Sequence, residues 1–126
     1  MSSFEGAFQE WWHLLLDNAV SENLIGNGFD KPLAELLRAI EPTDLGRFMP
    51  FTSMCQLCLA TSNYPWEEVK PACVEFWPDG RFPFRYRVIR RSPYPAGTEK
   101  EVVTLETNDP VAATDELVRL VLGTPD

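Results

Sequence analysis

The sequence contains a single histidine, His13, and only three cysteines, Cys55, Cys58 and Cys73. Secreted disulfide scaffolds use an even number of regularly spaced cysteines, so this odd set predicts reduced thiols. The chain also lacks a glycine-rich phosphate loop, a nucleophile elbow and a run of metal-binding carboxylates. These absences lead us to expect no catalytic site, no cofactor and no metal, and therefore no enzyme.

The histidine and the cysteines are the residues that could still carry chemistry. Asp17 follows His13 by four residues, on the same face of a helix, and could orient its imidazole. Cys55 and Cys58 have the spacing of a zinc knuckle or a thiol-redox motif, for which Cys73 and the histidine would supply the remaining ligands. On a strand, however, thiols three residues apart point to opposite faces. We therefore expect a surface or half-buried histidine and buried, apolar cysteines.

The sequence has no long hydrophobic run. Its apolar segment 11–16 is far too short to span a bilayer, and its first residues hold no basic stretch leading into an apolar stretch and a cleavage site. Both features predict a cytoplasmic protein without a membrane partner. With 126 residues, 44% of them hydrophobic and 24% charged, the chain has ordinary globular composition and the size of one domain, residues 1–126.

Basic residues are also few, and they are unevenly placed. The net charge is −8, yet residues 71–98 carry five arginines against Glu75 and Asp79, a local charge of +3. The flanking segments 1–70 and 99–126 are acidic, with net charges of −6 and −5. This distribution repels nucleic acid and favours a basic or mixed-charge protein partner.

Hydrophobic periodicity predicts three helices and four strands. Apolar residues at helical spacing indicate helices over residues 4–22 and 31–40, and Asp109 with Pro110 opens a third that Gly123 ends. Alternating or β-branched segments predict strands over residues 49–59, 68–77, 81–88 and 101–107. Consecutive strands joined by short turns form an antiparallel meander, and helices before and after it cover one face. The predicted fold is a two-layer α+β domain in the order ααββββα, with a four-stranded antiparallel meander, two N-terminal helices and one C-terminal helix.

The strongest local signal is a hairpin around Pro78, Asp79 and Gly80. Proline suits a type I turn, and Gly80 can take the left-handed conformation of a bulge, which pairs Trp77 with Arg81. One face of this hairpin is apolar, with Val74, Phe76, Phe82, Phe84, Tyr86 and Val88. The other face, here called the basic face, carries Cys73, Glu75, Trp77, Arg81, Arg85 and Arg87. A two-residue turn would place apolar and charged side chains on the same face of the hairpin. The separation of the two kinds of side chain therefore favours the bulged register.

The basic face departs most from the acidic background of the chain. Arginine and tryptophan are enriched at binding hot spots, and a cation–π contact between Trp77 and Arg81 would hold both side chains in place. Two interpretations stay open. The arginines pair with acids of this same chain, such as Glu75, or the face binds a partner through Trp77, Arg81, Arg85 and Arg87.

Two segments resemble the small immunity proteins of bacterial toxin systems. They are Pro-Trp-Glu-Glu-Val at residues 65–69 running into Val-Glu-Phe-Trp-Pro-Asp-Gly at residues 74–80, and residues 109–123. Small size, acidity and an aromatic hairpin followed by a late helix add to the resemblance. It implies inhibition of a cognate toxin by direct one-to-one binding and assigns no particular residues. For that role we expect contacts from the basic face or from an acidic helix surface with Trp12, Asp17 and Glu22.

An acidic secretion chaperone is the alternative. Such chaperones are dimers that hold a non-globular stretch of a secreted effector, and they resemble this chain in size, acidity and α+β content. They usually place a helix among the strands to form the dimer interface, and none is predicted between residues 47 and 107. A small enzyme or a nucleic-acid-associated protein is the third interpretation, and a small-molecule ligand is not expected.

Overall fold

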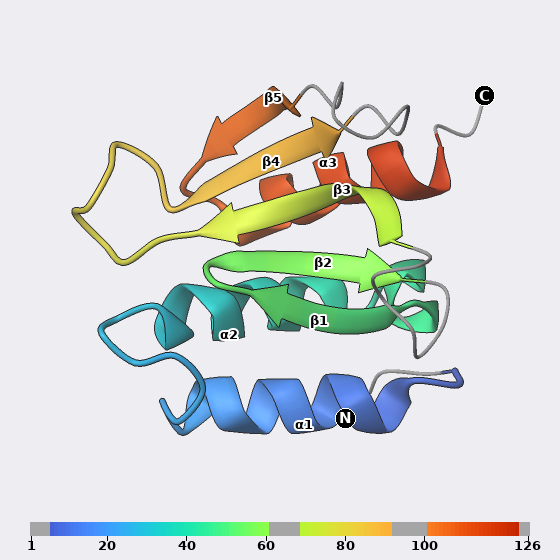
Figure 1. The fold of residues 1–126 in the computed structure, drawn as a ribbon, viewed down its shortest axis with the longest axis horizontal. Helices are drawn as coiled ribbons and strands as arrows, with labels where there is room; N and C mark the ends of the chain where they lie inside the picture. The colour runs from blue at the N-terminus through green and yellow to red at the C-terminus, as the bar shows by residue number, and fades with distance from the viewer. Residues whose placement is uncertain (1–5, 61–68, 92–100, 124–126) are drawn as a thin grey trace.

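The computed structural model describes residues 6–60, 69–91 and 101–123, in which helices flank a run of strands (Figure 1). The helices are α1 (Gln9–Val20), α2 (Asp30–Ile40) and α3 (Pro110–Leu122), and η1 (Asp44–Arg47) is a short 3-10 helix. The strands are β1 (Met49–Ser53), β2 (Gln56–Ala60), β3 (Val69–Phe76), β4 (Tyr86–Arg91) and β5 (Glu101–Thr107).

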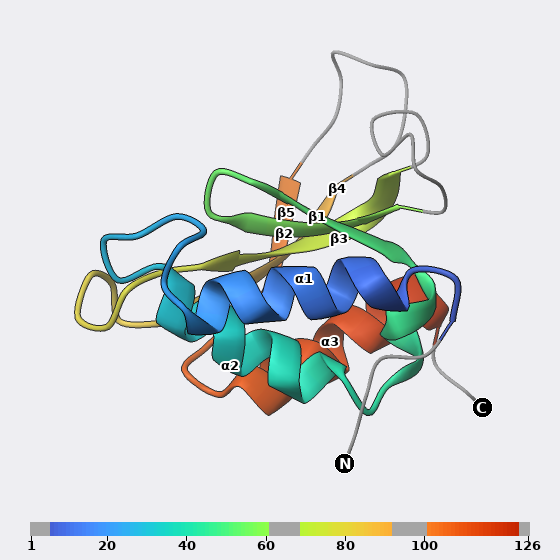
Figure 2. The same cartoon turned by 90° about the horizontal axis from the view of Figure 1, so that it is seen from below.

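The strands form one antiparallel sheet in the order β1-β2-β3-β4-β5, and all three helices lie on one of its faces (Figure 2). The predicted fold class, an α+β chain with an antiparallel meander, is therefore confirmed. The predicted strand count is wrong, because the sheet has five strands rather than four. None of the helices in the described ranges is long and apolar enough to cross a lipid bilayer.

The fifth strand arises within residues 49–59, where the sequence predicts a single strand. Ser53 pairs with Gln56, so a two-residue turn at Met54 and Cys55 folds this segment into β1 and β2. Met54 takes a positive φ of 55°, a conformation that glycine and asparagine adopt most readily. Neither residue stands here, and the turn therefore leaves no signal in the sequence.

Most other element bounds lie close to the predicted ones, but the strand predicted over residues 81–88 is wrong in its start, because β4 spans Tyr86–Arg91. The helix predicted over residues 31–40 and the strand predicted over residues 101–107 are confirmed as α2 and β5. The first helix starts later than predicted, at Gln9, because Gly6 has a φ of 111° and lies outside the helical region. Residues 1–5, where the predicted helix would begin, lie outside the described ranges.

The hairpin between β3 and β4 has the predicted faces but not the predicted register. Val74 lies opposite Val88, whereas a tight turn at Gly80 would place Phe84 there. The pairing is displaced by four positions, an even number, and side chains alternate with a period of two. Each residue of the paired strands therefore keeps its predicted face.

The turn itself forms at the tip of a longer loop, residues 77–85. Gly80 has a φ of 82°, and the N–H of Arg81 donates to the carbonyl of Pro78 at 3.3 Å. Because the strands stop short of this turn, Phe82 is 41% exposed. Its predicted place in the core is wrong, while Phe84 is buried at 8%.

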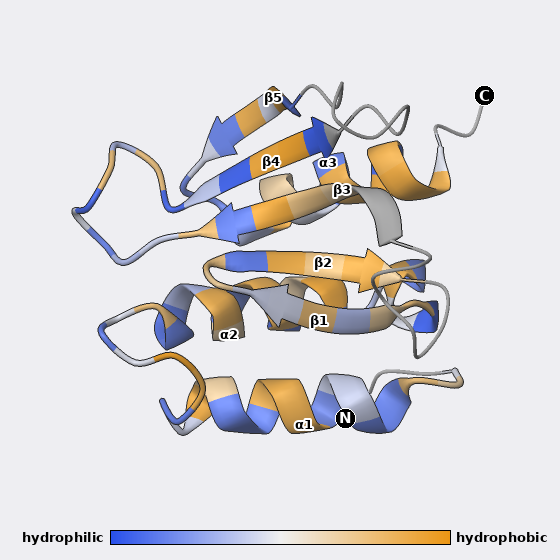
Figure 3. Ribbon diagram, viewed as in Figure 1, coloured by the Kyte–Doolittle hydropathy of each residue, from blue (hydrophilic) through white to orange (hydrophobic). Residues whose placement is uncertain are grey.

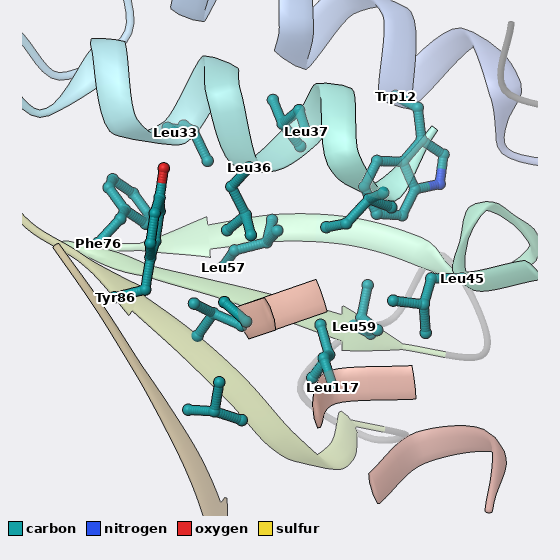
Figure 4. Close-up of a cluster of buried hydrophobic side chains, with 14 of the residues drawn as sticks. Trp12, Leu33, Leu36, Leu37, Leu45, Leu57, Leu59, Phe76, Tyr86 and Leu117 are labelled. Carbon is teal, nitrogen blue, oxygen red and sulfur yellow. The ribbon is translucent and has the colours of Figure 1, made fainter. Parts of the chain in front are cut away.

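The main core lies between the helices and the sheet (Figure 4). Its largest fully buried side chains include Trp12, Leu33, Leu36, Leu37, Leu45, Leu57, Leu59, Phe76 and Tyr86. Two hydrogen bonds satisfy the polar atoms of the aromatic members. Trp12 Nε1 donates to the carbonyl of Phe48 at 2.8 Å, and the Tyr86 hydroxyl donates to the carbonyl of Pro32 at 2.6 Å.

A second, smaller cluster lies on the sheet face that points away from the helices. It joins Cys58, Cys73 and Ile89, with Phe51 packed against them. The hydrophobic middle of β4, orange in Figure 3, supplies both clusters, since Val88 joins the main core and Ile89 joins this one. The prediction of buried cysteines is thus confirmed for Cys58 and Cys73.

Candidate protein-binding groove

Three connections meet at one end of the fold, on the left in Figures 1 and 2: the α1–α2 loop, the β1–β2 turn and the β3–β4 loop. They enclose an open groove of about 470 Å³. It is lined by Leu24, Ile25, Phe29, Thr52, Met54, Cys55 and Trp77. Apart from Thr52, these side chains are apolar, aromatic or sulfur-containing, so the groove offers a surface for apolar groups.

Large hydrophobic side chains stand exposed around this groove. Met54 is 89% exposed, Phe82 41% and Ile25 36%. Each comes from a different one of the three connections, and together with the groove they form the surface that we call the loop-end patch. Contiguous apolar patches on soluble proteins commonly mark protein interaction sites, whereas single exposed apolar residues do not.

Trp77 anchors the loop-end patch. Its ring centroid lies 5.9 Å from that of Phe29 and 4.8 Å from that of Phe82, the latter in an edge-to-face arrangement. Its indole N–H donates to Glu75 Oε1 at 3.4 Å. These contacts hold a half-buried tryptophan in one orientation at the groove wall, as is typical of binding hot spots.

Asp30 fixes the opposite wall of the groove. Its buried carboxylate accepts three successive backbone N–H groups of the α1–α2 loop, from Leu24 at 3.0 Å, Ile25 at 2.8 Å and Gly26 at 3.3 Å. Asp30 is only 1% exposed, and charge-assisted hydrogen bonds of this kind are roughly twice as strong as neutral ones. The loop that presents Leu24 and Ile25 is therefore already ordered before any partner binds.

Cys55 lines the groove, and its thiol is a weak nucleophile. Partial burial raises the pKa of its thiol, and the nearby Glu75 carboxylate raises it further. The thiol, not the nucleophilic thiolate, is then the dominant form at neutral pH. Cys55 therefore contributes apolar surface to the groove rather than a reactive group.

Arg85 does not share a surface with the other arginines of the predicted basic face. It turns toward α2 and makes a two-pronged ion pair with Glu35, at 3.1 Å and 2.6 Å. Its Nε lies 2.8 Å from Asp79 Oδ1, an ion-pair distance at which the N–H is not aligned for a hydrogen bond. Hydrogen bonding to Arg85 holds the pKa of Glu35 below its usual value, which partial burial opposes.

Arg87 is also paired within the chain. Its Nη1 lies 3.7 Å from Glu75 on β3, and its Nε lies 3.2 Å from Glu106 on β5. The guanidinium also lies 4.8 Å from the centre of the Phe84 ring. For Arg85 and Arg87, the structure thus favours pairing with this chain's own acids over an open binding surface.

Arg81 and Trp77 are the members of the predicted basic face that reach the loop-end patch. Arg81 is exposed in the β3–β4 loop. The Trp77 ring contacts the rings of Phe29 and Phe82, tilted against the first and edge-to-face with the second, rather than the Arg81 guanidinium. The predicted surface is therefore reduced to one arginine and one tryptophan beside the groove.

The three partner contacts predicted on and just after the first helix do not form one exposed surface. Trp12 is fully buried, so its predicted surface role is wrong; the exposed tryptophan of this helix is Trp11, at 47%. Asp17 is exposed and lines a second, polar cleft between α1 and α2. Glu22 is exposed just after α1, with a φ of 58° that ends the helix.

The polar cleft has a volume of about 550 Å³ and holds the single histidine. Its lining residues are His13, Leu16, Asp17, Val20, Ser21, Arg38 and Glu41. His13 and Asp17 thus share one face, as their spacing predicts, and none of the cysteines lines this cleft. Within the described ranges, no group of three or more histidine, cysteine, aspartate or glutamate side chains is arranged to hold a metal ion.

Comparison of the chain with protein-family models, with curated proteins and with solved structures found no match. Function must therefore be inferred from the geometry of the chain itself. Sequence patterns missed Ile25, Phe29 and Met54, which lie in three segments far apart in the chain. A glycine-rich loop at residues 26–28 was the one local signal near them, and it predicts a turn rather than a groove.

Proposed function

We propose that this chain is a binding protein that engages another protein through the loop-end patch, and that it acts as an immunity protein of a bacterial toxin system. The observation that carries this proposal is the exposure of Ile25, Met54 and Phe82 around one apolar groove. An ordered tryptophan at the groove wall and an α1–α2 loop fixed by Asp30 lower the conformational entropy that binding must remove. One-to-one inhibition of a toxin domain suits such a compact surface.

The partner that suits this surface presents an apolar side chain to the groove and carries a basic surface around it. The net charge of −8 attracts a basic protein and raises the rate of encounter. The apolar contacts then supply affinity, since central buried anchors dominate binding energy. Arg81, beside the groove, would meet an acidic group or a carbonyl on the partner.

Co-expression with the product of the adjacent gene tests the proposal. We expect that product to be toxic alone and harmless beside this protein, and the two to co-purify in a one-to-one complex. Met54→Asp should abolish protection, because it places a charge where an apolar group docks. If the neighbouring product is harmless alone, or stays toxic beside this protein, the immunity proposal fails.

Leu14→Asp is the matched control for that variant. Leu14 is 56% exposed on α1 and does not line the groove. The substitution therefore introduces the same charge at an exposed apolar residue outside the groove. We expect Leu14→Asp to protect as well as the unchanged chain. If Leu14→Asp abolishes protection and Met54→Asp does not, the binding surface lies instead on α1, near Asp17.

A dimeric secretion chaperone is the second candidate, and edge strand β5 favours it. Val102 and Val103 are adjacent, point to opposite faces and are 43% and 45% exposed. An exposed, β-branched edge strand can pair with another chain. Light scattering on the purified chain separates the candidates, because a stable dimer would have twice the monomer mass of 14.3 kDa.

A further inference from the structure

Two of the three cysteines stand directly opposite each other in the middle of the sheet. Cys58 on β2 is the Cα partner of Cys73 on β3, and both side chains belong to the small cluster on the face away from the helices. They are 3% and 2% exposed and are reduced in the structure. The loop-end patch does not use this pair.

The hydrogen-bond pattern of β2 and β3 shows which kind of pair they form. The N–H of Phe76 donates to the carbonyl of Cys55 at 2.9 Å, so those two residues form a hydrogen-bonded pair. Hydrogen-bonded and non-hydrogen-bonded pairs alternate along an antiparallel ladder. Three steps further along, Cys58 and Cys73 therefore form a non-hydrogen-bonded pair, the type in which opposite side chains lie closest.

This placement suits a disulfide. Opposite Cα atoms in a non-hydrogen-bonded pair lie about 4.5 Å apart, and disulfides join Cα atoms separated by about 4.4–6.8 Å. Both thiols project from the same face, so the two Cβ atoms already point in a common direction. This spacing lies near the short end of the range that disulfides span.

We propose that Cys58 and Cys73 are an oxidation site that forms a reversible cross-strand disulfide with a peroxide as oxidant. One thiolate attacks a peroxide oxygen and becomes a sulfenic acid, while the O–O bond breaks and hydroxide leaves and takes up the proton that the thiol released. The second thiol then attacks this sulfur, the S–S bond forms and water leaves. Two thiols and one hydrogen peroxide give one disulfide and two waters.

The ladder beside Cys58 provides a route for the small oxidant. The pairing of β2 with β3 is irregular between Cys58 and Ala60, and such bulges interrupt the regular hydrogen bonds. Local opening there costs less than opening the whole sheet. Once formed, the bond would tie together residues fifteen positions apart and stabilise the contact between β2 and β3.

Cys55 is the internal control in the same chain. It lies in the β1–β2 turn and lines the groove, opposite Phe76 rather than a cysteine. The geometry therefore assigns the disulfide to Cys58 and Cys73 rather than to Cys55.

The experiment treats the folded full-length chain with hydrogen peroxide, blocks the remaining thiols and digests the product with a protease that cleaves after glutamate. Cleavage after Glu67, Glu68 and Glu75 separates the peptide with Cys55 and Cys58 from the peptide with Cys73. We expect the two peptides joined, a blocked Cys55, and full reversal by dithiothreitol. The oxidised chain should also melt at a higher temperature than the reduced chain.

Cysteine-to-serine variants sharpen the assignment. Cys55→Ser should still form the joined product, whereas Cys58→Ser and Cys73→Ser should not. The proposal is overturned by a link through Cys55, by a disulfide between chains, or by oxidation only to the sulfinic acid. Absence of any link in the unchanged folded chain also overturns it, provided the same peroxide oxidises the chain in urea. The mapping on the unchanged chain holds even if a serine variant fails to fold.

Discussion

The hydroxyl of Tyr86 connects the sheet to α2. The side chain is fully buried, and its O–H donates to the carbonyl of Pro32 at 2.6 Å. Tyr86→Phe keeps the ring and removes only this donor. We expect the free energy of unfolding to fall by about 1–2 kcal/mol, seen as a lower urea midpoint with an unchanged slope. An unchanged midpoint would show that the hydrogen bond adds nothing to stability.

The ion pair between Glu35 and Arg85 should make stability depend on pH. The folded-state pKa of Glu35 lies below its unfolded value of 4.5, so the pair stabilises the fold above that value. The contribution is lost as pH falls through 4.5 and on toward the folded pKa. Between pH 7 and pH 3, the melting temperature should therefore fall more steeply for the unchanged chain than for Glu35→Gln.

Asp17→Asn is the control for that comparison. It removes one negative charge from an exposed site on α1, away from Arg85. A flatter acid limb for Glu35→Gln than for Asp17→Asn assigns the pH dependence to the pair with Arg85. Identical pH profiles for Glu35→Gln and the unchanged chain would mean that the pair has no net effect on folding.

Which individual side chains are buried was only partly predictable from the sequence. Trp11 and Trp12 are adjacent, and helical spacing alone shows that one core cannot bury both. The structure buries Trp12 because its indole N–H reaches the carbonyl of Phe48, a partner 36 positions away. That choice depends on tertiary contacts, which no local pattern contains.

At the scale of the element, the hairpin shows what a pattern of faces can decide. A slip of one residue exchanges the two faces, so alternation excludes odd displacements. A displacement of four exchanges nothing, and the sequence of β3 and β4 fits both registers equally well. The positive φ of Gly80 was predicted correctly, whereas the predicted bulged register is wrong, because Val74 meets Val88 instead of Phe84.

The α1–α2 loop depends on Asp30 for its shape. Asp30→Ala would leave three N–H groups of the loop without their acceptor, and unsatisfied donors cost about 1–3 kcal/mol each when buried. We expect at least about 2 kcal/mol lower stability, measured by urea denaturation. Partner affinity should fall as well, because Leu24 and Ile25 line the groove.

Asp30→Asn separates the effect of the hydrogen-bond acceptor from the effect of the negative charge on the same loop. Its amide oxygen can still accept hydrogen bonds, although without the negative charge. Its stability should lie between that of Asp30→Ala and that of the unchanged chain. Equal losses for the two variants would show that charge, rather than an acceptor atom, orders the loop.

At the scale of the whole molecule, net charge should work against compactness. A folded chain with a charge of −8 concentrates like charges. Raising the salt concentration from about 10 mM to 150 mM shortens the screening length from about 30 Å to about 8 Å. We expect the melting temperature to rise with sodium chloride over this range. A fall would mean that ion pairs such as Arg119 with Glu116 outweigh the repulsion.

The class of the fold was predictable from the sequence, and the loop-end patch was not. Helices and strands follow from periodicities of a few residues, which composition and spacing reveal. The patch brings together Ile25, Met54 and Phe82 from three separate connections, and only the folded sheet and helices bring them together. The turn at Met54 that completes it is itself invisible in the sequence.

The half-buried indole of Trp77 also gives the molecule an optical property. The chain has four tryptophans. Trp12 is sealed in the core, Trp11 is exposed on α1 and Trp77 borders the groove, so these three indoles differ in their access to solvent. Iodide should quench the emission of Trp77 when the groove is open and spare it when the groove is filled. The difference between the emission of the unchanged chain and that of Trp77→Phe isolates this signal. Groove occupancy can thus be followed by intrinsic fluorescence, with no label attached to either protein.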